Sequence, residues 1–211
     1  MIVVGGGGAT RFGSDKLLAD IGGRPLVSHT LAAVIPCVDV CVLVCSDAVA
    51  EVIGGIHPDV VTASPGSTRT QSEISGLNAV PGQAALIGIH DAARPAAKTE
   101  LVMHLYEVAA ETGGAVPVLT AGVAFVDRET RRPVEGLARA QTPQVFRGPE
   151  LRAAYRSAAA AGFEGHDTAD VITRFSTLEI AAVPGDPSNA KVTYPEDLEA
   201  VRETLKGSSR T

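Results

Sequence analysis

Four consecutive glycines, Gly5 to Gly8, follow a short apolar run at the start of the chain, and Arg11 and Lys16 come soon after them. Glycine backbone can approach an anion closely and present its N–H groups to it, because no Cβ atom stands in the way. A fixed guanidinium and a mobile ammonium group suit a phosphoryl group in transfer. The loop therefore predicts phosphate chemistry that uses Arg11 and Lys16.

Two better-known glycine loops do not fit this stretch. A dinucleotide-binding fingerprint that begins at Gly6 needs a third glycine where Arg11 stands, which disfavours a dehydrogenase. A P-loop that begins at Gly8 reaches Gly13 but then needs lysine at the position of Ser14. A glycine run can also be no more than a tight turn, so the loop alone leaves its function open.

Charge and hydropathy exclude whole classes of protein. The 211 residues include 18 Lys and Arg against 24 Asp and Glu, a formal net charge of −6, and 45% of them are hydrophobic. An acidic chain lacks the electrostatic footprint of a protein that binds nucleic acid polymers. No apolar run is long enough for a membrane span, and no signal peptide is visible. We therefore expect a cytoplasmic protein with neither a nucleic acid polymer nor a membrane as partner.

Three cysteines, Cys37, Cys41 and Cys45, are spaced four residues apart in one apolar stretch. This spacing suits neither a CxxC redox pair nor a zinc site. On a strand, Cys41 and Cys45 would share a face at a separation of about 13 Å, which is too far for a disulfide. We predict buried, reduced thiols.

The elements that must position the glycine loop alternate along the chain. Proline and capping residues mark helix starts at Pro25, after Ser67 or Thr68, at Pro149 and after Pro195. Between these helix starts lie short runs of β-branched residues and one stretch with apolar residues at helical spacing. Strands are predicted at 2–4, 40–45, 59–63, 84–90, 114–119 and 178–183, and a further helix at 98–112. This pattern predicts an α/β protein with a three-layer Rossmann-like fold, a mostly parallel sheet with helices on both faces.

One segment breaks the alternation. Residues 120–140 are polar and rich in turn formers, and they are long enough to leave the body as a hairpin or arm. An ordinary long surface loop fits this composition equally well. We expect one domain over 1–211 with 120–140 as a protruding arm within it.

Five stretches together resemble a known family. Their order and spacing match the motifs of the 2-C-methyl-D-erythritol 4-phosphate cytidylyltransferases, which are nucleotidyltransferases of the sugar-nucleotide synthase fold. The resemblance covers nearly the whole chain. The stretches are GGGGATRFGSDKLL at 5–18, GSTRTQS at 66–72, HDAARP at 90–95, QTPQVF at 141–146 and KVTYPEDL at 191–198.

The resemblance implies an activity. In this family CTP and 2-C-methyl-D-erythritol 4-phosphate are joined to a CDP-sugar alcohol, and pyrophosphate is released, in the non-mevalonate route to isoprenoid precursors. It also implies Mg²⁺ as cofactor on the triphosphate, and a homodimer in which the 120–140 arm reaches the partner's site. Catalysis of this kind needs cations, backbone donors and one carboxylate, and no covalent enzyme intermediate.

The resemblance also implies roles for the matching residues. Arg11, Lys16 and Lys191 match catalytic cations of the family, and Lys191 matches the lysine that orients the attacking phosphate. Asp91 matches the Mg²⁺ ligand, and its place after a predicted strand is where open α/β sheets bind ligands. His90 beside it is expected to pack at the strand end. The nucleotide-binding set is Gly5, Gly6, Gly7, Gly8, Gly66, Ser67, Arg69, Ser72, Asp91 and Ala92.

The acceptor half of the site resembles the family less closely. Val134 stands where the family has an arginine, and Arg131 or Arg132 is a candidate substitute. His166 replaces a threonine. The predicted acceptor-binding set is Arg94, Thr142, His166, Asp167 and Lys191.

Three departures from the family pattern leave alternatives open. Asp15 precedes Lys16 where the family has proline, and Ser67 stands where it commonly has aspartate, which leaves selectivity for CTP open. The altered acceptor positions allow another polyol phosphate, such as ribitol 5-phosphate, as the acceptor. A nucleotide-binding relative without turnover is a further alternative, which the presence of all four matching charged residues, Arg11, Lys16, Asp91 and Lys191, disfavours.

Overall fold

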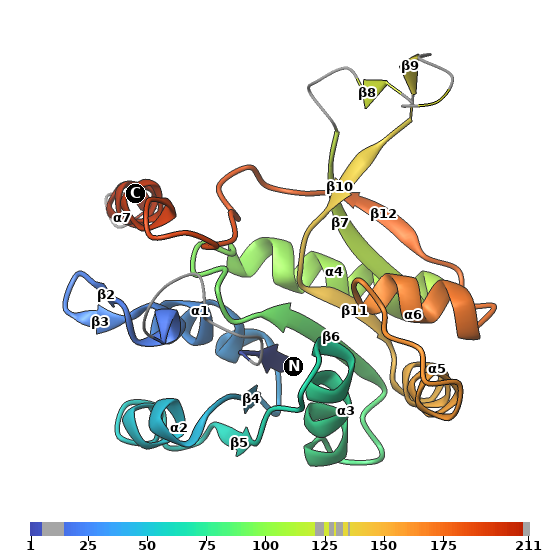
Figure 1. Cartoon of the computed structure of the whole chain (residues 1–211), viewed down its shortest axis with the longest axis horizontal. Helices are drawn as coiled ribbons and strands as arrows, with labels where there is room; N and C mark the ends of the chain where they lie inside the picture. The colour runs from blue at the N-terminus through green and yellow to red at the C-terminus, as the bar shows by residue number, and fades with distance from the viewer. Residues whose placement is uncertain (6–14, 121–124, 127–128, 130–132, 135, 209–211) are drawn as a thin grey trace.

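The computed structural model describes residues 1–5, 15–120, 125–126, 129, 133–134 and 136–208 (Figure 1). Their centre is an eight-stranded sheet in the order β10-β7-β11-β6-β1-β4-β5, with β12 paired to β7. Strand β1 is parallel to β4 and β6, β4 to β5 and β12 to β7, whereas β11 and β10 run antiparallel to their neighbours. The strands are β1 (Ile2–Val4), β4 (Val42–Val44), β5 (Val61–Ala63), β6 (Leu86–Asp91), β7 (Gly114–Thr120), β10 (Ala138–Ala140), β11 (Gln144–Arg147) and β12 (Ala181–Pro184).

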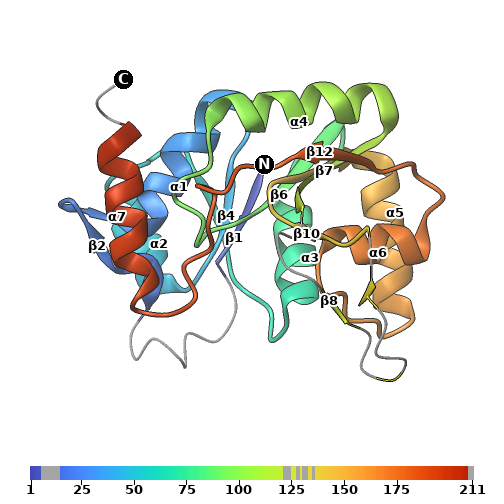
Figure 2. The ribbon, with the colours of Figure 1, turned by 90° about the horizontal axis from the view of Figure 1, so that it is seen from above.

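Helices cover both faces of this sheet, as Figures 1 and 2 show. Val3 packs in a core cluster with α1, α2, α4 and α7, while its neighbours Ile2 and Val4 pack with α3, α5 and α6. Successive side chains of a strand point to opposite faces, so an all-apolar strand must be covered twice. The predicted three-layer α/β fold is confirmed. The helices are α1 (Leu26–Val34), α2 (Asp47–Gly54), α3 (Arg69–Ala79), α4 (Thr99–Thr112), α5 (Gly148–Ala160), α6 (Thr168–Phe175) and α7 (Asp197–Ser208), with 3₁₀ turns η2 (Lys16–Leu18) and η3 (Ile35–Cys37).

Helix starts follow the signals in the sequence. Thr68 is the N-cap of α3, and its Oγ1 accepts the Gln71 N–H at 3.2 Å. Such a cap satisfies one of the free N–H groups at a helix start. Pro25 immediately precedes α1, and Pro149 lies in the first turn of α5. The predicted starts at these three residues are confirmed.

Helices α2 and α6 and strand β11 have no counterpart in the sequence-based prediction. Helices α2 and α6 have only 8 residues each, so neither offers a long apolar period. Strand β11 begins at Gln144, which is 1% exposed because its amide bonds Asp167 Oδ2 and the Ala169 N–H. A polar residue buried by partners far along the chain breaks the apolar run by which a strand is recognised.

The segment 120–140 carries two short antiparallel pairings. Strand β10 pairs with the end of β7, and β8 (Phe125–Val126) pairs with β9 (Pro133–Val134). In Figure 1 the second pair stands away from the body of the protein. The described part of this segment therefore has the geometry of a hairpin, while its role as a dimerisation arm stays a prediction. A further two-residue pairing joins β2 (Asp20–Ile21) and β3 (Arg24–Pro25).

The cysteines are free thiols, as predicted. Cys41 and Cys45 are buried, and Cys37 is partly buried. Burial raises the pKa of both Cys41 and Cys45 to about 11. These two side chains are therefore protonated core residues near neutral pH.

Within the part of the chain that the structure describes, no helix has the length and apolar character that crossing a membrane requires.

Candidate active site

Asp91 forms the centre of the candidate site, at the carboxyl end of β6. The strand pairs with β1 so that Asp91 lies beside Val4, and the next residue, Ala92, donates its N–H to the Val4 carbonyl at 3.0 Å. Ala92 is itself buried, and its carbonyl accepts the Thr30 hydroxyl at 2.7 Å. The carboxylate is thus fixed at the edge of the sheet where α/β proteins bind ligands.

Three cations converge on the Asp91 carboxylate. Arg69 Nη1 donates to Oδ1 at 2.6 Å. Arg94 Nε donates to Oδ2 at 3.2 Å, and Lys191 Nζ lies 3.1 Å from the same oxygen. They come from α3, from the turn after β6 and from the stretch before α7, which are far apart in the sequence. Residues predicted from three separate motifs therefore lie together as one cluster.

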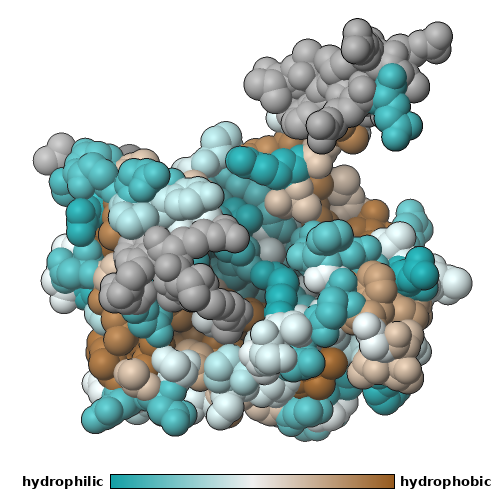
Figure 3. Space-filling view, in the orientation of Figure 1, coloured by the Kyte–Doolittle hydropathy of each residue, from teal (hydrophilic) through white to brown (hydrophobic). Residues whose placement is uncertain are grey.

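This cluster fixes the charge state of its carboxylate. Burial alone would raise the pKa of Asp91, whose side chain is only 7% exposed, but Arg69, Lys191 and Arg94 hold the pKa well below its usual range. Opposite charges at this range favour the ionised form over the neutral acid. Asp91 is therefore an anion throughout the pH range in which enzymes work. Hydrophilic residues gather near the centre of the molecular face that Figure 3 shows.

Lys16 lies on the same side, next to the stretch that carries Lys191. Its Nζ donates to the Val192 carbonyl at 3.2 Å. Asp15 caps the turn η2, because its Oδ1 accepts the Leu17 N–H at 3.1 Å. The aspartate that departs from the family pattern therefore fixes the backbone that carries Lys16. Arg11, Gly6, Gly7 and Gly8 lie outside the described residues.

Gly5 follows β1 and lies in close contact with strand β4 and the turn η2. Its N–H donates to the Val44 carbonyl at 2.7 Å. A Cβ atom at Gly5 would lie 2.6 Å from Leu17 Cδ1 and 2.9 Å from the Val44 oxygen. Both separations are too short for a real side chain. Glycine is required here by packing, in addition to any contact with phosphate.

Gly5→Ala is expected to lower the free energy of unfolding by about 1–3 kcal/mol, because the new methyl group overpacks against a fixed carbonyl. Urea denaturation of the purified protein measures this. Gly54→Ala is the matched control, since it adds the same methyl group at the end of α2, where no atom lies within 4 Å. Equal stability of the two variants would contradict the packing role of Gly5.

The stretch predicted to contact the nucleoside folds over the first turn of α3. Gly66 N–H donates to Ser72 Oγ at 3.1 Å, and Ser72 Oγ donates to the Thr68 carbonyl at 2.8 Å. Ser67 is exposed, and its hydroxyl donates to Gln71 Oε1 at 2.8 Å. Because the hydroxyl proton is used there, the lone pairs of Ser67 Oγ can accept a hydrogen from an exocyclic amine. A Cβ atom at Gly66 would collide with Gln71.

Thr142, a predicted acceptor-binding residue, is hydrogen-bonded to the backbone of Asp91. Its Oγ1 accepts the Asp91 N–H at 2.9 Å and lies 3.0 Å from Nδ1 of His90, and the peptide bond to Pro143 is cis. His90 is fully buried, and burial lowers its pKa to about 4. His90 is therefore neutral near pH 7. Its position agrees with a packing role at the strand end.

His166 and Asp167 lie at the start of α6. Asp167 is its N-cap, with Oδ1 accepting the Asp170 N–H and Oδ2 accepting Gln144 Nε2, both at 2.9 Å. His166 is exposed, and its N–H donates to Asp170 Oδ2 at 3.0 Å. Among the described residues, these bonds hold the Asp167 side chain and the His166 backbone to α6 and β11 rather than to the Asp91 cluster. Arg131 and Arg132 lie outside the described residues, and no side-chain contact of Val134 is described.

Two residues that the sequence interpretation missed fix the loop before Lys191. Asn189 is fully buried, donates Nδ2 to the Thr142 carbonyl at 2.8 Å, and accepts Arg94 Nη1 on its own carbonyl at 2.8 Å. Gln141 bonds the backbone of both Asp186 and Asn189. Gln141 begins the motif at 141–146, and Asn189 stands just before the motif at 191–198, but only the folded chain shows that these two residues join the motifs.

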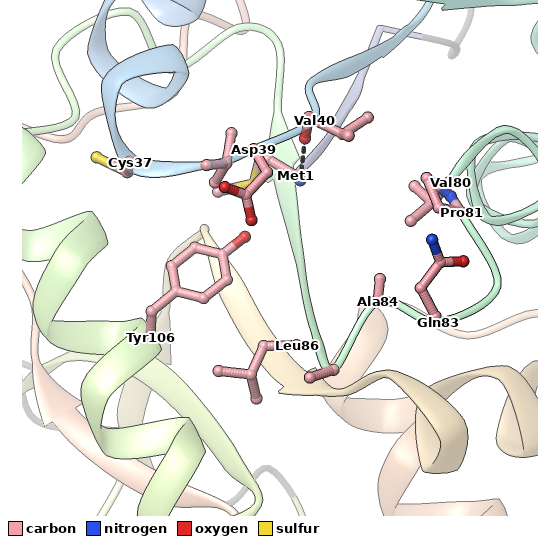
Figure 4. A pocket seen from close by; sticks show the side chains of 12 residues that line it. Met1, Cys37, Asp39, Val40, Val80, Pro81, Gln83, Ala84, Leu86 and Tyr106 are labelled. Carbon is pink, nitrogen blue, oxygen red and sulfur yellow. Dashed lines mark hydrogen bonds between the residues drawn. The ribbon is translucent and has the colours of Figure 1, made fainter.

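A separate pocket of about 450 Å³ lies at the opposite edge of the sheet (Figure 4). Met1, Val40 and Leu86 line it, near the starts of β1, β4 and β6. The buried hydroxyl of Tyr106, which points toward Asp39 and Met1 in Figure 4, has no hydrogen-bond partner among the described residues. None of the predicted site residues lines this pocket. The charged cluster therefore remains the candidate active site.

Comparison with known proteins identifies the family. The family model for 2-C-methyl-D-erythritol 4-phosphate cytidylyltransferase (IspD) matches residues 1–206. The bifunctional enzyme IspD/IspF of Rhodobacter capsulatus is 34% identical over 98% of this chain and 56% of its own length. The 2-C-methyl-D-erythritol 4-phosphate cytidylyltransferase of Aquifex aeolicus is 30% identical over 97% of this chain and 96% of its own.

Solved structures agree with this match. The 2-C-methyl-D-erythritol 4-phosphate cytidylyltransferase of Thermus thermophilus has a TM-score of 0.81 at 27% identity, over 98% of each chain. The present chain spans about half the length of the bifunctional relatives that it matches. With a family match over almost the whole chain and a site assembled from that family's motifs, this protein belongs to the 2-C-methyl-D-erythritol 4-phosphate cytidylyltransferase family.

Proposed function

We propose that this chain is a cytidylyltransferase that joins CTP and 2-C-methyl-D-erythritol 4-phosphate, giving the CDP-sugar alcohol and pyrophosphate in isoprenoid precursor synthesis. The observation that carries this proposal is the convergence of Arg69, Arg94 and Lys191 on Asp91. A site of this kind can bind two phosphorylated ligands next to each other. Family membership supports the two substrates named, and it does not favour ribitol 5-phosphate or a silent binding protein.

In the proposed reaction, a phosphate oxygen of the acceptor attacks the α-phosphorus of CTP, and pyrophosphate leaves with the electron pair of the bond that breaks. Lys191 orients the attacking phosphate, and Arg94 holds it from the other side. Arg11 and Lys16 neutralise the charge that develops on the phosphoryl group. Positioning and charge neutralisation are the main contributions that a protein makes to phosphoryl transfer.

The cations can be exchanged between Asp91 and the substrates. Lys191 is 39% exposed, and its ammonium group stands on a flexible stem. A phosphate carries more negative charge than one carboxylate, so incoming phosphates draw Lys191 and Arg94 away from Asp91 Oδ2. The free protein thus holds its cations in place before the substrates bind.

Asp91 is also the residue proposed to hold Mg²⁺. No group of three or more acidic, histidine or cysteine side chains suited to a metal exists among the described residues, so a metal here would depend on one carboxylate and on substrate phosphates. That donor set is an ordinary one for magnesium. Asp91 Oδ2 fits it, because Lys191 can leave that oxygen. When bound, the metal would neutralise charge on the triphosphate.

The proposal includes the assembly and location of the protein. We expect a homodimer in which the hairpin at 120–140 reaches the partner's site and supplies acceptor contacts, with Arg131 or Arg132 in place of the missing arginine. We also expect a cytoplasmic enzyme. The antiparallel pairing of β8 with β9 supports the hairpin geometry on which the dimer proposal depends.

Pyrophosphate release tests the function. With CTP, Mg²⁺ and 2-C-methyl-D-erythritol 4-phosphate, we expect continuous release, and little or none when UTP or ATP replaces CTP. The same assay with ribitol 5-phosphate is the control for the acceptor. Release with ribitol 5-phosphate alone would overturn the proposed substrate while keeping the chemistry. No release with either acceptor, despite CTP binding, would indicate a silent relative.

A further inference from the structure

Glu73 is a buried carboxylate that the proposed reaction does not use. Its side chain is 1% exposed, on α3, one turn after Arg69. Its Oε2 accepts the Tyr155 hydroxyl of α5 at 2.6 Å, and its Oε1 accepts the Thr168 hydroxyl at the start of α6 at 3.2 Å. Burying a charge is costly, and apolar side chains would fill the same space at lower cost. Packing alone therefore does not explain why a carboxylate is buried at this position.

On the nucleotide side, Glu73 is the second carboxylate beside Arg69. Burial raises the pKa of Glu73, but Arg69 and the hydroxyls of Tyr155 and Thr168, which donate to its two oxygens, favour the anion. Arg69 Nε lies 3.0 Å from Glu73 Oε1, while Nη1 bonds Asp91 at 2.6 Å. The Nε–H is not aimed well enough at Glu73 for a hydrogen bond, so this contact is one of charge with charge. Burial would lower the pKa of Arg69, but Asp91 and Glu73 raise it. The Arg69 guanidinium is thus fixed between the carboxylates of Asp91 and Glu73.

On the acceptor side, two bonds join α3 to the segment at 165–168. Thr168 donates to Glu73, and Gly165 N–H donates to Thr70 Oγ1 at 3.0 Å. The predicted acceptor residues His166 and Asp167 stand between these two anchors. Figure 2 shows α3 beside α6. The position of the acceptor segment therefore depends on the same turn of α3 that begins with Arg69.

We propose that Glu73 is a positioning residue that joins the two halves of the site. This inference rests on the proposed function for the identity of the two ligands. The Asp91 carboxylate is shared by three cations, so Arg69 holds only part of the charge of its first anion. Glu73 keeps the guanidinium at the nucleotide, and the bond from Thr168 keeps the acceptor segment in register with it.

Two isosteric variants test this role. Glu73→Gln removes the second anion of Arg69, and we expect its affinity for CTP without metal, measured by calorimetry, to fall about tenfold, as does the loss of one interaction with a charged group. Thr168→Val removes only the bond at the acceptor segment. It is expected to raise the KM for the acceptor about tenfold while leaving the affinity for CTP and kcat unchanged. A purely structural carboxylate would not produce this division between the two ligands.

Arg152→Gln is the matched control. Arg152 joins α5 to the far end of α3 by donating to the Leu77 and Val80 carbonyls at 2.6 and 2.9 Å. Its loss should reduce thermal stability but leave both affinities unchanged. If Glu73→Gln does not fold, the KM of Thr168→Val for the acceptor decides whether the bond to Glu73 positions the acceptor segment.

Unchanged affinities in Glu73→Gln and Thr168→Val would overturn the inference. The inference would also be overturned if Glu73→Gln, Thr168→Val and Arg152→Gln all lost ligand affinity in proportion to their loss of thermal stability. If the unaltered protein binds CTP but releases no pyrophosphate with the acceptor, the proposed function fails. The CTP affinity of Glu73→Gln and the acceptor affinity of Thr168→Val, both measured by calorimetry, then still decide whether Glu73 positions Arg69 and the acceptor segment.

Discussion

Lys16→Ala is expected to lower kcat on the order of 10²-fold with little change in the KM for CTP. The ammonium group of Lys16 lies at the stretch 191–192, beside the cation proposed to orient the attacking phosphate. A mobile charge at this place interacts most strongly with the phosphoryl group when negative charge develops on it. Removing one preorganised donor of this kind costs about this much in rate. An interaction made mainly in the transition state affects kcat more than KM.

Steady-state pyrophosphate release measures both constants for Lys16→Ala. The backbone of η2 should persist in this variant, because Asp15 caps it through the Leu17 N–H rather than through the lysine side chain. Lys206→Ala is the matched control, since it removes an exposed lysine that pairs locally with Glu203 on α7. Normal turnover in Lys16→Ala, or an equal loss in both variants, would discard the assigned role.

Much of the fold could be predicted from the sequence, because β1 and β4 are buried on both faces and form unbroken apolar runs. Helix starts were recognisable where a local signal exists, as at Thr68 and Pro149. Strand β11 was missed because Gln144 is buried by bonds to α6, and no local pattern indicates a partner some twenty residues away. Tertiary contacts determined this element.

The candidate site was predictable in its members but not in its connections. The motifs supplied Arg69, Asp91, Arg94 and Lys191, but only the geometry shows that one carboxylate bonds three of the cations. Glu73 was missed because a glutamate four residues after an arginine is typical of an exposed helix pair. Its burial follows from α5 and α6 closing over α3. Residues that act through contacts distant in sequence have no local signature.

Asp91→Asn is expected to lower kcat/KM on the order of 10²–10³-fold, because this change removes the carboxylate at the centre of the cluster and with it the proposed anchor for Mg²⁺. The amide keeps the shape of the side chain, so the change is one of charge. Calorimetry of CTP binding, with and without Mg²⁺, gives a second readout. The variant should bind CTP no more tightly with Mg²⁺ than without it.

The same substitution has an expected cost in stability. Three cations lose their shared partner, and breaking a buried ion pair in this way costs on the order of 3 kcal/mol. Because the pKa of Asp91 is lowered in the folded protein, its contribution is present above roughly pH 4 and is lost as the pH falls below that. The unfolding free energies of Asp91→Asn and the unaltered protein should therefore differ near neutral pH and converge in acid.

Urea denaturation across this range tests the stability prediction, with Asp47→Asn, an exposed aspartate in the first turn of α2, as the matched control for loss of one charge. The control should lose only a few tenths of a kcal/mol, as expected for a surface charge at a helix N-terminus. A constant gap between Asp91→Asn and the unaltered protein at all pH values would mean that the ion cluster does not set the charge state of Asp91. Full activity of Asp91→Asn would remove it from the site, and the three cations would then have to be assigned to substrate phosphates directly.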